Sequence, residues 1–258
     1  MNSYAPHRRV DGAAIPYLES PLFIQPHCDD AVLSSFTLLK RSRDPLVVTC
    51  FAGVPDPSVP PTDSDRLTGI TSPYQRMLFR RTEDRAALAA LGASAVHLDF
   101  VERAHRQNQD ETGIVEHLAE SIRPFAHERS TIVCPLGIGG NPNHAQAAAA
   151  VFTLAREMGI DVLWCADYPY AAWFSWPSWV TLTQTNPLLQ PDALWQPALA
   201  GVGHPHVCTV VELSDDLVRE KLEVFSMYET QVAVVERGDL RAVSHPDHIR
   251  YEVFYSTI

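Results

Sequence analysis

The sequence is poor in positive charge, with 20 lysine and arginine residues against 31 aspartate and glutamate residues and a net charge of −11. Affinity for nucleic acid comes largely from a basic surface, so we expect neither nucleic acid nor an anionic membrane as a partner. The same balance gives no long-range attraction for polyanionic substrates and favours neutral or cationic small molecules. We therefore expect a small-molecule substrate.

Long apolar runs are also absent. No stretch approaches the roughly 20 uncharged apolar residues of a membrane span, and the N-terminal segment has no signal-peptide core. The five cysteines are scattered without any CxxC spacing, which is typical of reduced thiols and not of a disulfide framework or a structural zinc site. We expect a cytoplasmic protein, and the sequence is compatible with a homo-oligomer.

What the sequence does contain is an alternation of short β-branched runs with longer helical stretches. This pattern is typical of βαβ units and predicts an α/β fold, a Rossmann-like doubly wound and mostly parallel sheet with helices on both faces. The predicted strands cover residues 22–25, 46–51, 96–100, 131–134, 161–165 and 206–212. The predicted helices cover about residues 30–42, 74–91, 110–126, 144–158 and 215–229.

The regularity ends near residue 170. We expect a single domain over residues 1–258, with a core at 20–170 and, at 171–258, a cap over the substrate pocket with a C-terminal helix. The tryptophans of this cap either line a pocket for a sugar or close the core under long loops. Residues 54–73 are rich in proline, serine, threonine and aspartate, which predicts a lid.

Polar residues gather directly after the first predicted strand. Loops at the carboxyl ends of parallel strands surround the ligand crevice, and His27, Asp29 and Asp30 stand there. Two carboxylates at a helix start can cap the helix, although one aspartate would suffice for that. Imidazole nitrogen with carboxylate oxygen suits Zn²⁺, Fe²⁺ or Mn²⁺, so we predict a divalent metal on His27 and Asp30.

A catalytic metal site needs a third protein ligand, which should come from another strand end. The predicted strand at 131–134 is followed by a glycine-rich turn and then by His144, which stands at a helix start as Asp30 does. Such a turn can instead bind phosphate, but the sequence has neither a GxGxxG motif after the first strand nor a GxxxxGK[ST] motif. We predict His144 as the third ligand.

Several segments in the same order resemble motifs of the PIG-L/LmbE-type metal-dependent N-deacetylases, and the resemblance spans about residues 20–255. They are PHCDDAVLS at 26–34, FAGVP at 51–55, RRTED at 80–84, DYPY at 167–170 and YETQ at 228–231. Each motif is weak alone, whereas the ordered set is specific.

This resemblance implies a zinc-dependent hydrolase, with Fe²⁺ or Mn²⁺ as alternatives, that removes an N-acetyl or other N-acyl group from an amino-sugar-containing small molecule or natural product. It implies that His27, Asp30 and His144 bind the metal and that Asp29 is the general base. It also implies that Arg80 holds the substrate or supports the site.

The resemblance likewise implies that Asp167 holds the substrate or supports the site. Tyr170, His204 and His206 stand in regions that could reach the crevice, where they would bind substrate or take over the role of a missing catalytic group. The alternative is that the two histidines lie in surface loops and that the tyrosine packs in the core. A second sequence of the HxDH type, at 245–248, lies in a late loop outside the expected context and is interpreted as a decoy.

One motif departs from the family pattern. The family's HxDH reads here as Asn141-Pro142-Asn143-His144, so the metal ligand is kept while asparagines replace the oxyanion histidine and its supporting aspartate. Asn141 can still donate a hydrogen bond to the oxyanion, but losing such a donor typically costs about 2.7–4 kcal/mol. Two rival interpretations stay open: a family member that performs a different reaction, and a catalytically impaired homologue that binds ligand.

Overall fold

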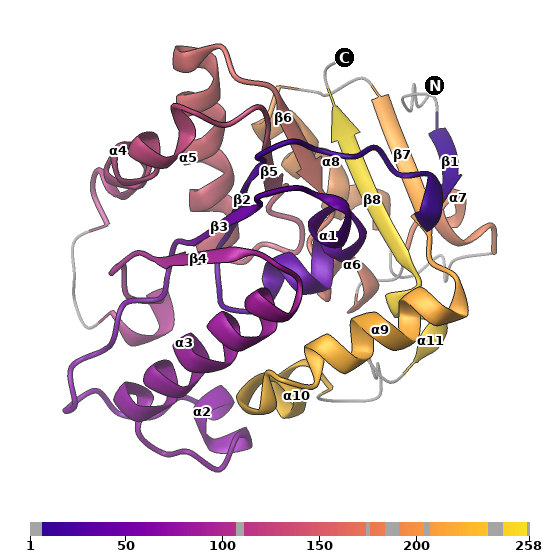
Figure 1. Cartoon of the computed structure of the whole chain (residues 1–258). Helices are drawn as coiled ribbons and strands as arrows, with labels where there is room; N and C mark the ends of the chain where they lie inside the picture. The colour runs from indigo at the N-terminus through magenta and orange to yellow at the C-terminus, as the bar shows by residue number, and fades with distance from the viewer. Residues whose placement is uncertain are drawn as a thin grey trace.

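A computed structural model gives the three-dimensional structure and describes residues 7–106, 111–173, 176–183, 191–203, 207–236 and 245–256. Its centre is an eight-stranded sheet with the order β1-β7-β8-β6-β5-β2-β3-β4 (Figure 1). The strands are β1 (His7–Asp11), β2 (Leu22–Gln25), β3 (Leu46–Thr49), β4 (Ser94–His97), β5 (Ile132–Pro135), β6 (Val162–Cys165), β7 (Val207–Glu212) and β8 (Tyr251–Ser256).

The sheet is mostly parallel, as predicted, because only β8 runs antiparallel to its neighbours β6 and β7. All residues of β2, β3 and β5 are buried, as expected for parallel strands that are covered on both faces. The six predicted strands are confirmed with small shifts at their ends. β1 and β8 were not predicted from the sequence.

Helices cover both faces of this sheet (Figure 1). The longer ones are α1 (Asp30–Arg41), α3 (Pro73–Ala90), α4 (Ile114–Ala126), α5 (Pro142–Met158), α8 (Pro191–Gly201), α9 (Asp215–Phe225) and α10 (Glu229–Val235). The short ones are η1 (Gly12–Ala14), α2 (Asp63–Leu67), η2 (Arg103–His105), α6 (Tyr170–Trp173), α7 (Ser178–Thr181) and α11 (Pro246–Ile249). On one face α1 and α3 contact α9, and on the other α5 contacts α4 and α8.

Two expectations about helices need correction. The predicted helix at 215–229 is two helices, α9 and α10, because the chain leaves the helical path between Phe225 and Glu229. The predicted lid at 54–73 is not wholly irregular, because it contains α2, which begins with a capping box between Thr62 and Asp65.

The region 171–258 contributes β7 and β8 to the same sheet as the core. Trp176 and Trp195 of this region are buried and pack edge to face with neighbouring aromatic rings, which closes the core under the connecting segments. Trp173 instead lines the main pocket. Among the described residues, no helix is long and apolar enough to cross a membrane.

The strand order reverses between β2 and β5, which lie side by side and parallel. From β2 the chain proceeds through β3 to β4 in one direction, and from β5 to β6 in the other. Ligands of open α/β sheets bind at the carboxyl ends of the strands at such a switch point. The residues predicted to hold the metal lie there, in the loop after β2 and at the starts of α1 and α5, the helices that follow β2 and β5.

Candidate metal centre

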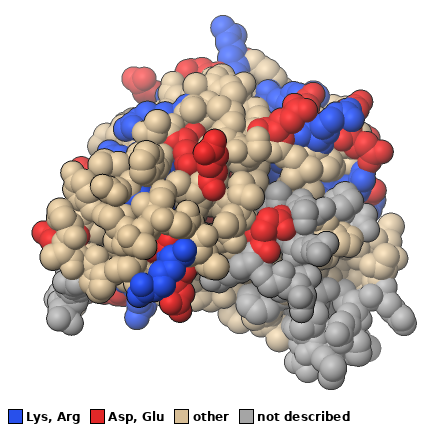
Figure 2. All heavy atoms as spheres, turned by 90° about the horizontal axis from the view of Figure 1, so that it is seen from below, with Lys and Arg blue, Asp and Glu red and all other residues tan. Residues whose placement is uncertain are grey.

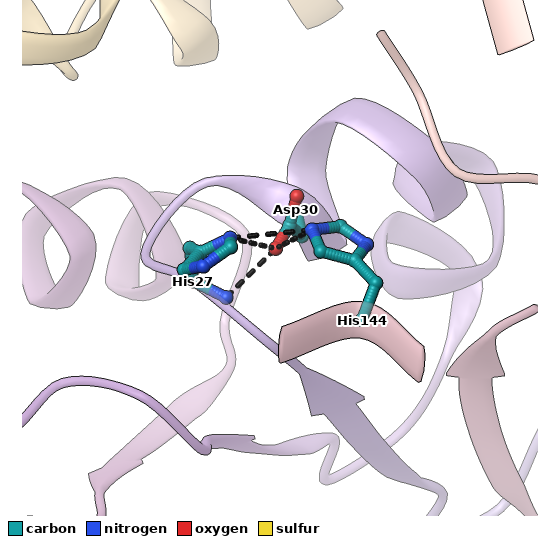
Figure 3. A group of neighbouring side chains, drawn as sticks. All are labelled: His27, Asp30 and His144. Carbon is teal, nitrogen blue, oxygen red and sulfur yellow. Dashed lines mark hydrogen bonds and ion pairs between the residues drawn. The ribbon is translucent and has the colours of Figure 1, made fainter. Parts of the chain in front are cut away.

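His27, Asp30 and His144 point toward one another across the switch point (Figure 3). His27 and Asp30 lie where β2 leads into α1, and His144 lies in the first turn of α5. Asp30 Oδ2 lies 3.4 Å from His27 Nδ1 and 3.4 Å from His144 Nε2, and these two nitrogens are 3.2 Å apart. The fold therefore brings together three ligands predicted from two distant segments.

These three distances match the spacing that a tetrahedral metal requires. Bonds of about 2.0–2.1 Å at tetrahedral angles place neighbouring ligand atoms about 3.3–3.4 Å apart. Burial acts to raise the pKa of Asp30, but His144 and His27 lower it below its ordinary value, so the carboxylate is ionised. The donor set therefore fits a divalent metal bound through three protein atoms, with one tetrahedral position left for a further ligand.

Asp167 lies behind His144, on the side away from the main pocket. Its Oδ1 is 2.7 Å from His144 Nδ1, and its carboxylate accepts hydrogen bonds from the backbone N–H groups of Gly137 and Ile138. A carboxylate in this position fixes the ring and would leave the Nε2 lone pair of His144 available to a metal. The geometry thus favours the supporting role over substrate contact for Asp167.

Asp29 stands next to the ligands but does not cap α1. It occupies the N-cap position without a side-chain hydrogen bond to the helix, and its φ of 122° is rare for a residue other than glycine. Burial, and then the charge of Asp30, raises the pKa of Asp29 well above its ordinary value. Two adjacent carboxylates with pKa values pushed apart are typical of an acid–base assignment, so the structure argues against a mere capping role.

Asn141 and Tyr170 form a pair beside the ligands. Asn141 caps α5 by accepting the N–H of Asn143 on its Oδ1, while its Nδ2 donates to the Tyr170 hydroxyl at 2.6 Å. Burial, and then the charge of Asp30, raises the pKa of Tyr170, so the phenol keeps its proton. Because the phenol oxygen accepts from Asn141, the phenol O–H proton is available to donate into the pocket that both residues line.

The pocket around this centre has a volume of about 610 Å³, within the usual range of ligand sites. Arg80 lies in its wall, 4% exposed, ion-paired with Glu102, and donates from its NH2 group to the Cys28 carbonyl at 3.3 Å. This hydrogen bond ties α3 to the loop that carries Asp29. Arg80 therefore positions the loop and also faces the pocket.

A second polar cluster in the wall was missed by the sequence analysis. Asp65 of α2 accepts from Arg76 at 2.8 Å and lies 2.9 Å from His105 Nε2, and Arg76 also donates to Gln231 at 3.4 Å. Glu102 and His105 follow β4, so the strand-end rule that was applied to β2 and β5 would have found them there. Through this cluster, the lid segment is anchored to the pocket wall.

Another group with metal-ligand chemistry, formed by Cys28, Asp84 and His97, does not fit a metal as well. The Asp84 carboxylate is already occupied by four side chains, Gln25, Thr49, His97 and Tyr228. Burial raises the pKa of the Cys28 thiol well above its ordinary value, which disfavours the thiolate that a metal needs. We interpret this group as a buried structural cluster.

His204 and His206 fall outside the described residues. His245 and His248, from the second HxDH-like sequence, stack on each other with ring centroids 4.5 Å apart, and neither lines the main pocket.

Fold and site together define an α/β protein with a candidate metal centre in a polar pocket at the switch point of its sheet. The chain belongs to the PIG-L family, described as GlcNAc-PI de-N-acetylase, whose profile matches residues 22–155. This family is the one that the ordered motifs predicted. No curated protein matches the chain by sequence.

Solved structures share the fold. The zinc-inhibited form of teicoplanin deacetylase Orf2 is 22% identical with a TM-score of 0.71, covering 92% of this chain and 97% of that one. The A40926 pseudoaglycone deacetylase Dbv21 is 25% identical with a TM-score of 0.68, covering 92% and 96%. N,N'-diacetylchitobiose deacetylase from Pyrococcus horikoshii is 15% identical with a TM-score of 0.52, covering 93% and 84%.

Proposed function

We propose that this protein is a zinc-dependent N-deacetylase that removes an acetyl or related acyl group from the amino-sugar part of a small molecule or natural product. The observation that carries the proposal is the spacing of the His27, Asp30 and His144 ligand atoms. Beside them lies Asp29, whose side chain makes no capping hydrogen bond to α1. The family and the deacetylases that share the fold support this reaction class.

The net reaction adds water across an amide, so the carbonyl carbon gains an oxygen and loses the amine nitrogen. A zinc ion on the three ligands would polarise the carbonyl and lower the pKa of water beside it. Asp29 would accept the proton of the attacking water and return it to the departing nitrogen. Its buried place next to Asp30 supports this assignment.

The carbonyl oxygen becomes an oxyanion during this reaction and needs hydrogen-bond donors. Asn141 Nδ2 and the Tyr170 hydroxyl are paired in the pocket next to His144, whose ring packs edge to face against Tyr170 with centroids 5.0 Å apart. We assign the donation to the oxyanion to this pair. It would replace the histidine that the family uses at position 141.

The substrate class follows from the pocket and the surface. The pocket wall mixes arginines with carboxylates and adds the aromatic side chains of Tyr170 and Trp173, which suits a hydroxyl-rich ring. Figure 2 shows acidic and basic side chains scattered over the face seen from below, and the described residues of this face form no large patch of either sign. An uncharged sugar conjugate is the natural ligand for such a surface.

The five cysteines are buried and form no disulfide, which supports action in a reducing compartment.

The test is acetate release from a panel of N-acetylated sugars and sugar conjugates, compared with amides that carry no sugar. We expect Asp29→Asn to lower kcat by at least 10²-fold, the usual contribution of a general base, while one zinc ion per chain is retained. His144→Ala should lose both zinc and turnover. Unchanged turnover in Asp29→Asn would show that Asp29 is not the base.

The asparagines at 141 and 143 support one competing proposal, a homologue that binds ligand without hydrolysis. It predicts that the wild-type protein binds zinc and N-acetylated sugars while releasing no acetate from any member of the panel. Release of an acyl group from an amide outside the sugar set would instead indicate a different substrate class for the same site.

A further inference from the structure

The two histidine ligands differ in what lies behind them. His144 Nδ1 faces the Asp167 carboxylate. An ionised carboxylate accepts hydrogen bonds and cannot donate them. His27 Nε2 instead faces the side-chain amide of Asn143, with Nδ2 at 2.9 Å. Asn143 is 4% exposed, so water does not readily compete for this contact.

The orientation of the Asn143 amide is fixed by its other neighbours. Its Oδ1 accepts from the Arg106 NH2 group at 2.9 Å and from the Arg103 backbone N–H at 3.4 Å. A guanidinium and a backbone N–H can only donate, so the oxygen of the amide must face them. The amide N–H₂ group is therefore directed at His27 Nε2.

This arrangement conflicts with metal binding by His27. The nitrogen next to Asp30 and His144 is Nδ1, and a neutral imidazole that binds a metal through Nδ1 carries its proton on Nε2. That N–H would face the N–H₂ group of Asn143, donor against donor. Turning the amide over would face its N–H₂ group toward Arg106, whose Nε and NH1 already lack hydrogen-bond partners.

Resting on the proposed metal site, we propose that Asn143, held by Arg106, is a positioning residue that weakens the binding of the divalent metal by His27. An aspartate at position 143 would accept from His27 Nε2–H and from Arg106 at the same time. Loss of a carboxylate partner behind a ligand histidine typically costs about 10–100-fold in metal affinity. The centre thus combines one supported histidine with one unsupported histidine.

The test measures zinc affinity of the metal-free protein by competition with a chromogenic chelator at constant pH. We expect Asn143→Asp to lower the dissociation constant by about 10–100-fold. The matched control is Gln146→Glu, which adds the same charge beside Arg106 without touching His27, since Gln146 Oε1 accepts from Arg106 NH2 at 3.3 Å. This control should change affinity by less than about threefold, as expected for a solvent-screened charge.

A second readout separates the hydrogen bond from general stabilisation. In the zinc-loaded protein with ¹⁵N-labelled histidine, a slowly exchanging Nε2–H of His27 should be seen in Asn143→Asp and not in the wild type. Equal tightening by Asn143→Asp and Gln146→Glu, or no tightening by Asn143→Asp, would overturn the inference alone. Equal zinc binding by the wild type and His144→Ala would overturn the proposed metal site and the inference with it.

Discussion

At the scale of single residues, Tyr170 and Asn141 are the pair that we propose replaces a missing catalytic group, with one member coming from another element. Position 141 begins α5 and Tyr170 begins α6, and their side chains meet at 2.6 Å. Asn141 keeps the capping role that its position requires and still presents an N–H group to the pocket. The proposed replacement therefore involves both residues.

Tyr170→Phe tests this assignment. We expect kcat to fall on the order of 10²-fold, because a donor to the tetrahedral oxygen contributes mainly in the transition state, and KM to change little. Steady-state acetate release measures both constants. Tyr74→Phe makes the same chemical change at an exposed position of α3 outside the pocket and should leave kcat unchanged. A rise in KM with unchanged kcat in Tyr170→Phe would indicate ground-state binding instead.

Much of the centre could be predicted from single positions, because the segments that follow the carboxyl ends of parallel strands surround the ligand crevice. The position of a residue after its strand led to the prediction of His27, Asp30 and His144 as ligands, and the structure places these three side chains together. Partners of those residues could not be predicted in the same way. Arg106 and Asn143 are 37 residues apart, and their contact depends on how the loop after β4 folds over α5.

At the scale of elements, α3 is held against the loop after β4 by the ion pair of Arg80 with Glu102. Burial acts to raise the pKa of Glu102, but the Arg80 guanidinium, with smaller contributions from other side chains, lowers it to about 2. Unfolded glutamate has a pKa of about 4.3. Because the folded pKa is the lower one, this stabilisation is complete above about pH 4.3 and is lost as the pH falls toward 2.

We therefore expect Glu102→Gln to flatten the acid side of the stability profile. Between about pH 4.5 and 2 the free energy of unfolding of the wild type should fall more than that of the variant, by on the order of 3 kcal/mol. Urea unfolding at a series of pH values measures the difference. The exposed Glu223 on α9 offers a control, since Glu223→Gln should leave the slope as in the wild type. Parallel profiles for wild type and Glu102→Gln would contradict the prediction.

β1 and β8 could not be predicted because their sequences do not have the apolar pattern of a buried strand. In the described part of the chain, β1 lies at the sheet edge beside β7, and its polar sequence, HRRVD, does not resemble that of a buried strand. β8 carries the buried Glu252, which interrupts the apolar pattern. Its charge is tolerated because Lys221 of α9 donates to it at 2.9 Å, and no local pattern predicts that partner.

At the scale of the whole molecule, the centre joins two parts of the chain that are more than 100 residues apart in sequence. His27 and Asp30 lead into α1 on one face of the sheet, whereas His144 lies on α5 on the other face. The unfolded chain holds no such set of ligands, so a metal bound here adds its binding free energy to the stability of the fold.

Zinc should accordingly raise the melting temperature. At a free concentration of 100 times the dissociation constant, the added stability is about 2.7 kcal/mol, which corresponds to roughly 5–10 °C for a chain of this length. Thermal unfolding with zinc and with a chelator measures the shift, and Mg²⁺ should not produce it because it prefers oxygen ligands in octahedral geometry. His144→Ala should melt at the same temperature with zinc as with chelator. A zinc shift that persists in this variant would mean that the stabilising ion binds elsewhere. At equal zinc concentration, a larger shift in Asn143→Asp than in the wild type would show that the residue behind His27 sets the zinc affinity of this centre.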